Sequence, residues 1–379
     1  MRIALKRIIA HGKFIPEVDG LRFIAITSVV LFHLNEYLGV MDHHAYLASF
    51  EWGWLRKILS HGHIGVPLFF VISGFILGKP FAKHFLKAGP EISIKKYFLR
   101  RLTRLEPPYL VALGYFLFAA VWWSGAVPVE DGLLSFLASA TYTHNFFEGE
   151  GFPALLNGVT WSLEVEVQFY ILAPLVAGVF NIRNRVMRRG LLIAATLFFL
   201  VADFYDPFTF KSILNYADFF LLGFLLADLY VSESRIFRVS RLDPVFSILL
   251  LIPLWAYDYE DFSETYGQIL GEIMQLTSIF LLYYLILFHK SLKVMAQPLV
   301  TNIGGMCYSI YLMHYSVMGA LGYHLLQVQF SDHAFVNTAI YVAVLMSAVM
   351  LISVLFYVGI ERPCMDPNWM RKLARRQPF

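Results

Sequence analysis

The chain has 379 residues, of which 58% are hydrophobic and only 15% are charged. This composition excludes an ordinary soluble globular domain. Long apolar stretches recur along the whole chain, and they predict an all-α, polytopic membrane protein. The formal net charge is only +3, so the distribution of Lys and Arg is more informative than their sum. We expect no nucleic-acid partner.

The apolar stretches and the basic residues between them predict about ten spans, with both termini in the cytoplasm. On this topology all but three of the 30 Lys and Arg residues lie on the cytoplasmic side, the exceptions being Arg56, Lys57 and Lys211. Acidic loops face outward, with Glu130, Asp131, Glu148 and Glu150 in one and Asp258, Glu260, Asp261 and Glu264 in another. The predicted spans are about 21–38, 64–78, 109–127, 160–180, 191–202, 213–230, 244–257, 269–288, 303–326 and 335–360. The domain organisation expected is a cytoplasmic segment (1–20), one membrane domain (21–363) and a basic cytoplasmic tail (364–379).

The first predicted span holds two ionisable residues, Arg22 and His33. Eleven helical residues rise about 16 Å and turn about 20° past three revolutions, so both side chains share one helix face. His33 then lies about halfway through a ~30 Å hydrocarbon core. An ionisable residue at that depth is costly and indicates a functional site, although a core histidine bonded to a neighbouring helix is the alternative.

Arg101 and Arg104 open the third predicted span on its cytoplasmic side. Residues three apart share a helix face, and a helix N-terminus favours anions. Two guanidinium groups there make a fork suited to phosphate. The alternative is that these arginines only set the topology and contact anionic lipid.

Two more polar groups are predicted on later spans. Glu164 and Glu166 enter the fourth span within about two turns of the outer face, and they point in different directions because they are two residues apart. One carboxylate can therefore orient a histidine or a substrate hydroxyl, or hold two helices together. His314 lies about eleven residues into the ninth span, so it rivals His33 as the catalytic base.

Ser73 and Gly74 form a small pair that we assign to helix packing.

Together these residues resemble acyltransferase family 3, integral membrane O-acyltransferases that modify bacterial surface glycans and some small molecules. The resemblance covers about 20–363, and Pro67 stands where many members have Asp. Glu166 occupies the usual Glu of the family, whereas Glu164 is at a variable position. The matching motifs are an Arg and a His separated by ten residues (Arg22, His33), R-x-x-R (Arg101, Arg104), GV-x-x-FFVISGF (65–75), WS-x-x-VE-x-QFY (161–170), YSIYL-x-H (308–314) and E-x-P (361–363).

The resemblance implies transfer of an acyl group, acetyl in the first place, from cytoplasmic acyl-CoA to a hydroxyl of an extracytoplasmic or lipid-linked glycan, with no metal ion. It implies His33 and Glu166 as catalytic residues, with His33 acting either as general base or as an acyl-carrying relay. Arg101, Arg104 and Arg22 would bind the CoA. The supporting residues would be Arg22, His314, Ser309, Tyr311, Trp161, Ser162, Gln168, Tyr170 and Glu361.

Two other classes of function stay open. A multi-span transporter of a lipid-linked sugar or small solute would use the same intramembrane charges as a binding site, although no internal repeat is found. A signalling or scaffolding membrane protein would have no use for them. The expected location is the bacterial cytoplasmic (inner) membrane. The sequence predicts contact with membrane lipid and makes no prediction of oligomeric state.

Overall fold

The computed structural model describes residues 5, 7–8, 14–41, 53–147, 152–154, 156–205, 210–256, 264–366 and 368–374. Every regular element in this part of the chain is a helix, which confirms the all-α prediction. Several residues used for the topology lie outside the described residues, namely Arg2, Lys6, Lys13, Glu148, Glu150, Asp258, Glu260, Asp261 and Phe379.

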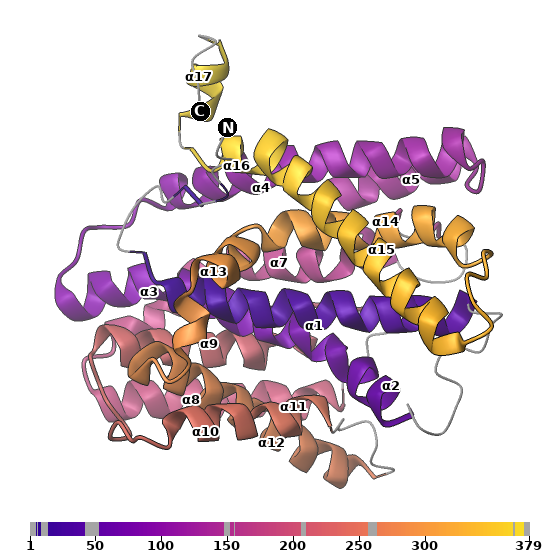
Figure 1. Ribbon diagram of the computed structural model, residues 1–379. Coiled ribbons are helices and arrows are strands. Elements are labelled where there is room, and N and C mark those ends of the chain that lie inside the picture. The colour runs from indigo at the N-terminus through magenta and orange to yellow at the C-terminus, as the bar shows by residue number, and fades with distance from the viewer. Residues whose placement is uncertain are drawn as a thin grey trace.

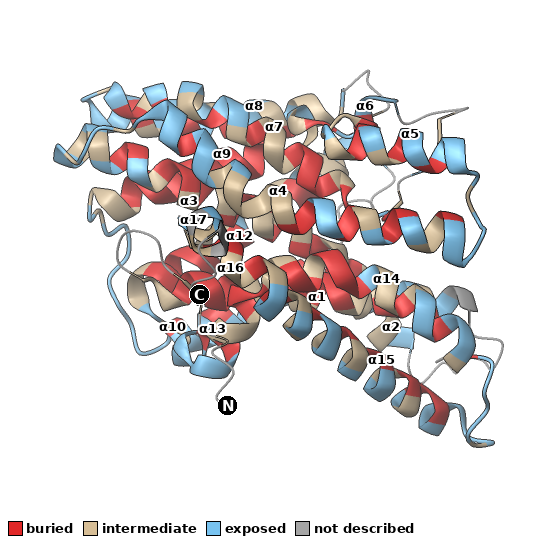
Figure 2. Ribbon diagram, turned by 90° about the horizontal axis from the view of Figure 1, so that it is seen from above, coloured by how far each residue is buried: buried red, intermediate tan, exposed pale blue. Residues whose placement is uncertain are grey.

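The helices run as follows: α1 (Pro16–Met41), α2 (Gly53–Ser60), α3 (Gly65–Lys87), α4 (Ile94–Phe118), α5 (Val129–Ala140), α6 (His144–Phe147), α7 (Trp161–Val176), α8 (Arg185–Asp203), α9 (Ala217–Val231), α10 (Asp243–Leu249), α11 (Leu251–Trp255), α12 (Thr265–Tyr284), α13 (Pro298–Gly305), α14 (Cys307–Leu325), α15 (Ala334–Phe356), α16 (Arg362–Cys364) and α17 (Trp369–Ala374). Figure 1 shows α1 running through the middle of the bundle. It packs against α3, α13 and α14. Figure 2 shows buried residues concentrated along α1, α3 and α9.

Five helical stretches in the described residues are long and apolar enough to cross a membrane: Gly53–Lys87, Ile94–Trp123, Trp161–Asn181, Thr265–His289 and Ala334–Cys364. Several apolar helices of this kind indicate an integral, multi-pass membrane protein. The helix α1, which holds the first predicted span, is 26 residues long but is not one of the five. The count of ten spans therefore stays a prediction.

Two predicted spans have different boundaries in the structure. The helix α4 begins at Ile94, where the Ser93 hydroxyl accepts a hydrogen bond from the Lys96 amide. Arg101 and Arg104 therefore lie about two and about three turns inside the helix, and the prediction that they open it was wrong. The ninth predicted span is divided at Met306 into α13 and α14. The short helix α2 was not predicted at all.

The ends of the described chain lie at the same end of the bundle. In Figure 1, α16 and α17 lie near the beginning of α4, and the Trp369 indole in α17 donates to the Thr103 carbonyl in α4 (3.1 Å). Near the N-terminus, the Arg7 guanidinium donates to Asp19 in the first turn of α1 (3.0 Å). These contacts hold the described ends of the chain to the first turn of α1 and to α4.

Small residues allow the close crossing of α3 and α9 at the centre of the core. A Cβ atom added to Gly74 would lie 2.2 Å from the Phe220 carbonyl oxygen, and one added to Gly223 would lie 2.3 Å from that of Val71. Glycines at such crossings let membrane helices approach closely. The packing role predicted for Gly74 is therefore confirmed.

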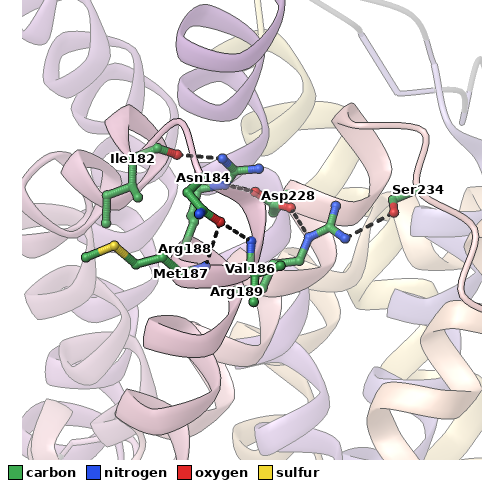
Figure 3. Close-up of polar contacts among 8 residues, drawn as sticks. All are labelled: Ile182, Asn184, Val186, Met187, Arg188, Arg189, Asp228 and Ser234. Carbon is green, nitrogen blue, oxygen red and sulfur yellow. Dashed lines mark hydrogen bonds and ion pairs between the residues drawn. The ribbon is translucent and has the colours of Figure 1, made fainter.

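A buried ion cluster joins α8 to α9 (Figure 3). Asp228 in α9 is completely buried and accepts from the Nε atoms of Arg188 and Arg189 in α8. Arg189 also donates a hydrogen bond to the Ser234 hydroxyl (3.1 Å), and Arg188 donates one to the Ile182 carbonyl (2.6 Å). One carboxylate thus holds two guanidinium groups in the interior, a costly arrangement that is stable only while every partner is present.

Candidate functional site

The structure brings the two rival histidines into contact. The Nδ1 atom of His33 in α1 lies 3.1 Å from the Nε2 atom of His314 in α14, and the ring centroids are 5.1 Å apart. His314 is fully buried, whereas His33 is partly exposed. Tyr315 packs edge-on against the His33 ring. The two imidazoles therefore form one unit.

Backbone carbonyls determine which ring nitrogens carry protons. The Nδ1 atom of His314 lies 3.0 Å from the Ile310 carbonyl oxygen and 2.8 Å from that of Tyr311. A carbonyl only accepts, so this Nδ1 is the donor and the Nε2 of the neutral ring is an acceptor. The Nδ1 of His33 faces the Val29 carbonyl (3.0 Å) as well as His314 Nε2, so it too carries the proton. The lone pair of a neutral His33 is thereby left on Nε2.

The beginning of α7 lies beside this pair. The Tyr311 hydroxyl, one turn from His314, donates to the Val159 carbonyl just before α7 (2.5 Å) and lies 3.1 Å from the Ser162 hydroxyl. Asn157 also donates to the Leu312 carbonyl (3.1 Å). The helix α7 therefore begins beside the second turn of α14.

The two glutamates of α7 have different partners, as their spacing predicted. One oxygen of Glu166 accepts from the Ser73 hydroxyl of α3 and from the Tyr170 hydroxyl (2.6 Å). Glu164 is completely buried and accepts a hydrogen bond from the backbone N–H of Asn145 (2.9 Å). This bond anchors α6 to α7. Sequence reasoning assigned Ser73 to packing only and missed its bond to Glu166. A lone serine in an apolar span gives no signal for such a contact.

Arg101 lies against aromatic rings beside Glu166. Its guanidinium carbon is 3.7 Å from the ring centroid of Tyr97 and 5.4 Å from that of Tyr170, and it donates to the Tyr97 carbonyl (3.1 Å). Such stacking of a planar group suits Arg better than Lys. Arg101 therefore lies beside Tyr170, the residue whose hydroxyl donates to Glu166.

Arg22 is held by a residue that sequence reasoning missed. Its guanidinium donates to Asp19 Oδ1 (2.7 Å), and the same oxygen accepts from Arg7 (3.0 Å). The i,i+3 spacing of Asp19 and Arg22 is the signal that could have found this pair. No hydrogen bond joins Arg22 to His33 among the described residues, so their shared helix face does not make them direct partners.

The remaining predicted residues separate into two places. Glu361, at the end of the last long helix, accepts from the amide (3.0 Å) and hydroxyl (2.5 Å) of Ser309 in α14. Trp161 packs 5.4 Å from Tyr216, under the Lys211 ammonium. Gln168 accepts from the Ile213 amide (2.8 Å). Trp161 and Gln168 therefore contact the segment before α9 rather than the histidine pair.

The described part of the chain holds no group of three or more His, Cys, Asp or Glu residues suited to a metal ion. The central features are thus a histidine pair, a carboxylate that binds two hydroxyl groups, and several partly buried arginines within a multi-helix membrane bundle.

Comparison with known proteins defines the class of this molecule. The model of the acyltransferase 3 family, described as "Acyltransferase domain", matches residues 15–358. The chain therefore belongs to this family, and its sequence resemblance to it is confirmed.

The names of two curated relatives contain the term O-acetyltransferase. The peptidoglycan O-acetyltransferase OatA of Listeria monocytogenes is 27% identical over 336 residues, which cover 81% of this chain and 50% of that protein. The Bacillus subtilis protein named "Putative peptidoglycan O-acetyltransferase YrhL" is 30% identical over 46% of this chain and 26% of its own length. The chain matches half or less of the length of these relatives. No solved structure is significantly similar to it.

Proposed function

We propose that this protein is a membrane O-acyltransferase that moves an acyl group, acetyl by analogy with its relatives, from cytoplasmic acyl-CoA to a glycan hydroxyl. The acceptor would be an extracytoplasmic or lipid-linked glycan at the bacterial cytoplasmic membrane. The family and the names of the relatives support this function. The single observation that carries it is the hydrogen-bonded histidine pair, since it leaves Nε2 of His33 as a base.

In this mechanism Nε2 of His33 takes the proton of the acceptor hydroxyl as that oxygen attacks the thioester carbonyl carbon. The carbon–sulfur bond then breaks, and the CoA thiolate receives the proton from His33. The positive charge that forms on His33 is stabilised by its Nδ1–H bond to His314. A relay in which Nε2 itself carries the acyl group needs the same lone pair, so both routes depend on this tautomer.

Glu166 would contribute from the acceptor side. Its Oε1 atom is occupied by Ser73 and Tyr170, which fixes the orientation of the carboxylate. The other oxygen can then accept a hydrogen bond from a hydroxyl of the acceptor. Ser309 and Glu361 would hold α14 against the last long helix and so position His314.

Arg101 and Arg104 are expected to bind the phosphate groups of the donor. Replacing either by Ala should weaken acetyl-CoA binding by about tenfold or more, because each loses a charge-assisted hydrogen bond. Arg101→Lys should keep only part of the acetyl-CoA affinity, since Lys cannot stack against Tyr97 and Tyr170 as the planar guanidinium does. Binding of labelled acetyl-CoA to the purified, folded variants measures this. Two Ala variants with parental affinity would refute the phosphate role.

The proposed topology makes a separate prediction. A reporter fused after Phe379 should be active only in the cytoplasm, and a cysteine placed near Glu148 should react with an impermeant reagent added outside the cell. The reason is the strong bias of Lys and Arg toward one set of loops. An externally exposed C-terminus would mean that the number of spans is odd, or that the orientation is reversed.

A further inference from the structure

Three described residues ahead of α1, Leu5, Arg7 and Ile8, lie against the bundle. Leu5 and Ile8 pack against the core cluster that contains Met306 and Met365. Arg7 lies between them in sequence, and it donates to Asp19 (3.0 Å). Its Cβ lies 3.6 Å from the position of a Cβ added to Gly305 at the end of α13. The position of Arg7 is therefore fixed by packing on both sides.

Positive charge exceeds negative charge around this residue. Arg7 and Arg22 share a single carboxylate oxygen of Asp19, whose other oxygen is buried without a hydrogen-bond partner. Within the residues that the structure describes, Arg104 has no hydrogen bond or ion pair. Burial, followed by the charges of Arg22 and Arg104, lowers the pKa of Arg7 to about 9. Arg7 thus stays protonated at neutral pH, close to two other guanidinium groups.

These contacts leave donors available for an anion. A guanidinium has five N–H groups in a planar fork, and Arg7 uses one nitrogen for Asp19. The nearby carboxylate of Glu361 already accepts two hydrogen bonds from Ser309. Arg7, Arg22 and Arg104 come from three different segments, so their charges converge only in the folded chain. Paired and clustered guanidinium groups of this kind suit a phosphate group.

We propose that Arg7 is a further binding residue that contacts a phosphate group together with Arg22 and Arg104. This inference rests on the proposed function, because CoA supplies the phosphate in that account. A phospholipid headgroup has the same chemistry, and the experiment must separate the two sources.

The test measures the binding of acetyl-CoA and of S-acetylpantetheine, which lacks the nucleotide part of CoA and with it every phosphate group, to protein in phosphatidylcholine nanodiscs. Arg7→Ala should weaken acetyl-CoA binding by about tenfold or more and leave S-acetylpantetheine binding unchanged. Arg7→Lys should lose less affinity than Arg7→Ala. The matched control is Arg183→Ala, which removes an exposed arginine elsewhere and should bind both donors as the parent does.

Each other outcome has a distinct meaning. An equal loss for both donors in Arg7→Ala and Arg7→Gln would make Arg7 structural and overturn the inference. A third outcome is that Arg7→Ala loses acetyl-CoA affinity only in nanodiscs that contain phosphatidylglycerol. That result would assign the phosphate contact of Arg7 to lipid and overturn the contact with CoA. If the parent binds acetyl-CoA no more tightly than S-acetylpantetheine, the proposed donor site itself fails, whatever Arg7 does.

Discussion

His33→Ala should abolish acyl transfer while donor binding is kept. Loss of a general base typically lowers the rate by about 10²–10⁴-fold, and a relay role for His33 would make the loss at least as large. Donor binding should persist because Arg101 and Arg104 lie on α4, and because Arg22, eleven residues before His33 on α1, is held by Asp19. The measurement is acyl transfer at matched protein levels, with acetyl-CoA binding determined in parallel.

Variants of His314 provide the comparison for this prediction. His314 accepts the Nδ1–H of His33 and so selects its tautomer. His314→Ala should lower the rate and leave measurable turnover, whereas His314→Gln, which keeps an acceptor oxygen, should be less impaired. Substantial turnover by His33→Ala beside an inactive, donor-binding His314→Ala would reverse the two roles.

Asp228→Asn should strongly destabilise the folded protein. The carboxylate is completely buried between Arg188 and Arg189 (Figure 3), and its removal leaves the buried Arg188 guanidinium without a counter-charge. Breaking one side of a buried ion pair costs about 3–5 kcal/mol. Thermal unfolding of the purified protein in detergent should therefore shift to a clearly lower temperature.

A matched control exists on the surface of the protein. Glu233 is 83% exposed and lies 3.6 Å from Lys87, and an exposed pair of this kind contributes about 0–1 kcal/mol. Glu233→Gln should unfold at nearly the parental temperature. If Asp228→Asn were equally unaffected, the cluster would not stabilise the α8–α9 contact.

The sequence predicted those features of the structure that depend on a single helix, such as its type and its apolar character. Hydropathy predicted an all-helical membrane protein, and the sequence patterns singled out both His33 and His314. Their hydrogen bond could not be predicted, because it joins residues 281 positions apart. The contact between Ser73 and Glu166 is equally unpredictable, because it depends on how closely α3 approaches α7.

Local signals also misled in identifiable ways. Pro107 and Pro108 suggested that the third span begins after them, yet both lie inside α4. Helix-breaking residues are tolerated in membrane helices because neighbouring groups satisfy the freed backbone. Arg101 and Arg104 therefore gain nothing from a helix terminus, and their proposed role rests on burial, aromatic stacking and the clustering of charge.

The central claim is that this protein carries out acyl transfer rather than transport, and one reconstitution tests it most directly. Purified protein in liposomes is supplied with acetyl-CoA labelled in the acetyl group on the side of its termini, and with a defined glycan on the other side. We predict that label appears in the glycan as an alkali-labile ester, with one free CoA thiol released for each ester formed. The reaction should be absent in His33→Ala. Movement of the glycan or of intact acetyl-CoA across the membrane, with no thiol released, would contradict the account and identify a transporter.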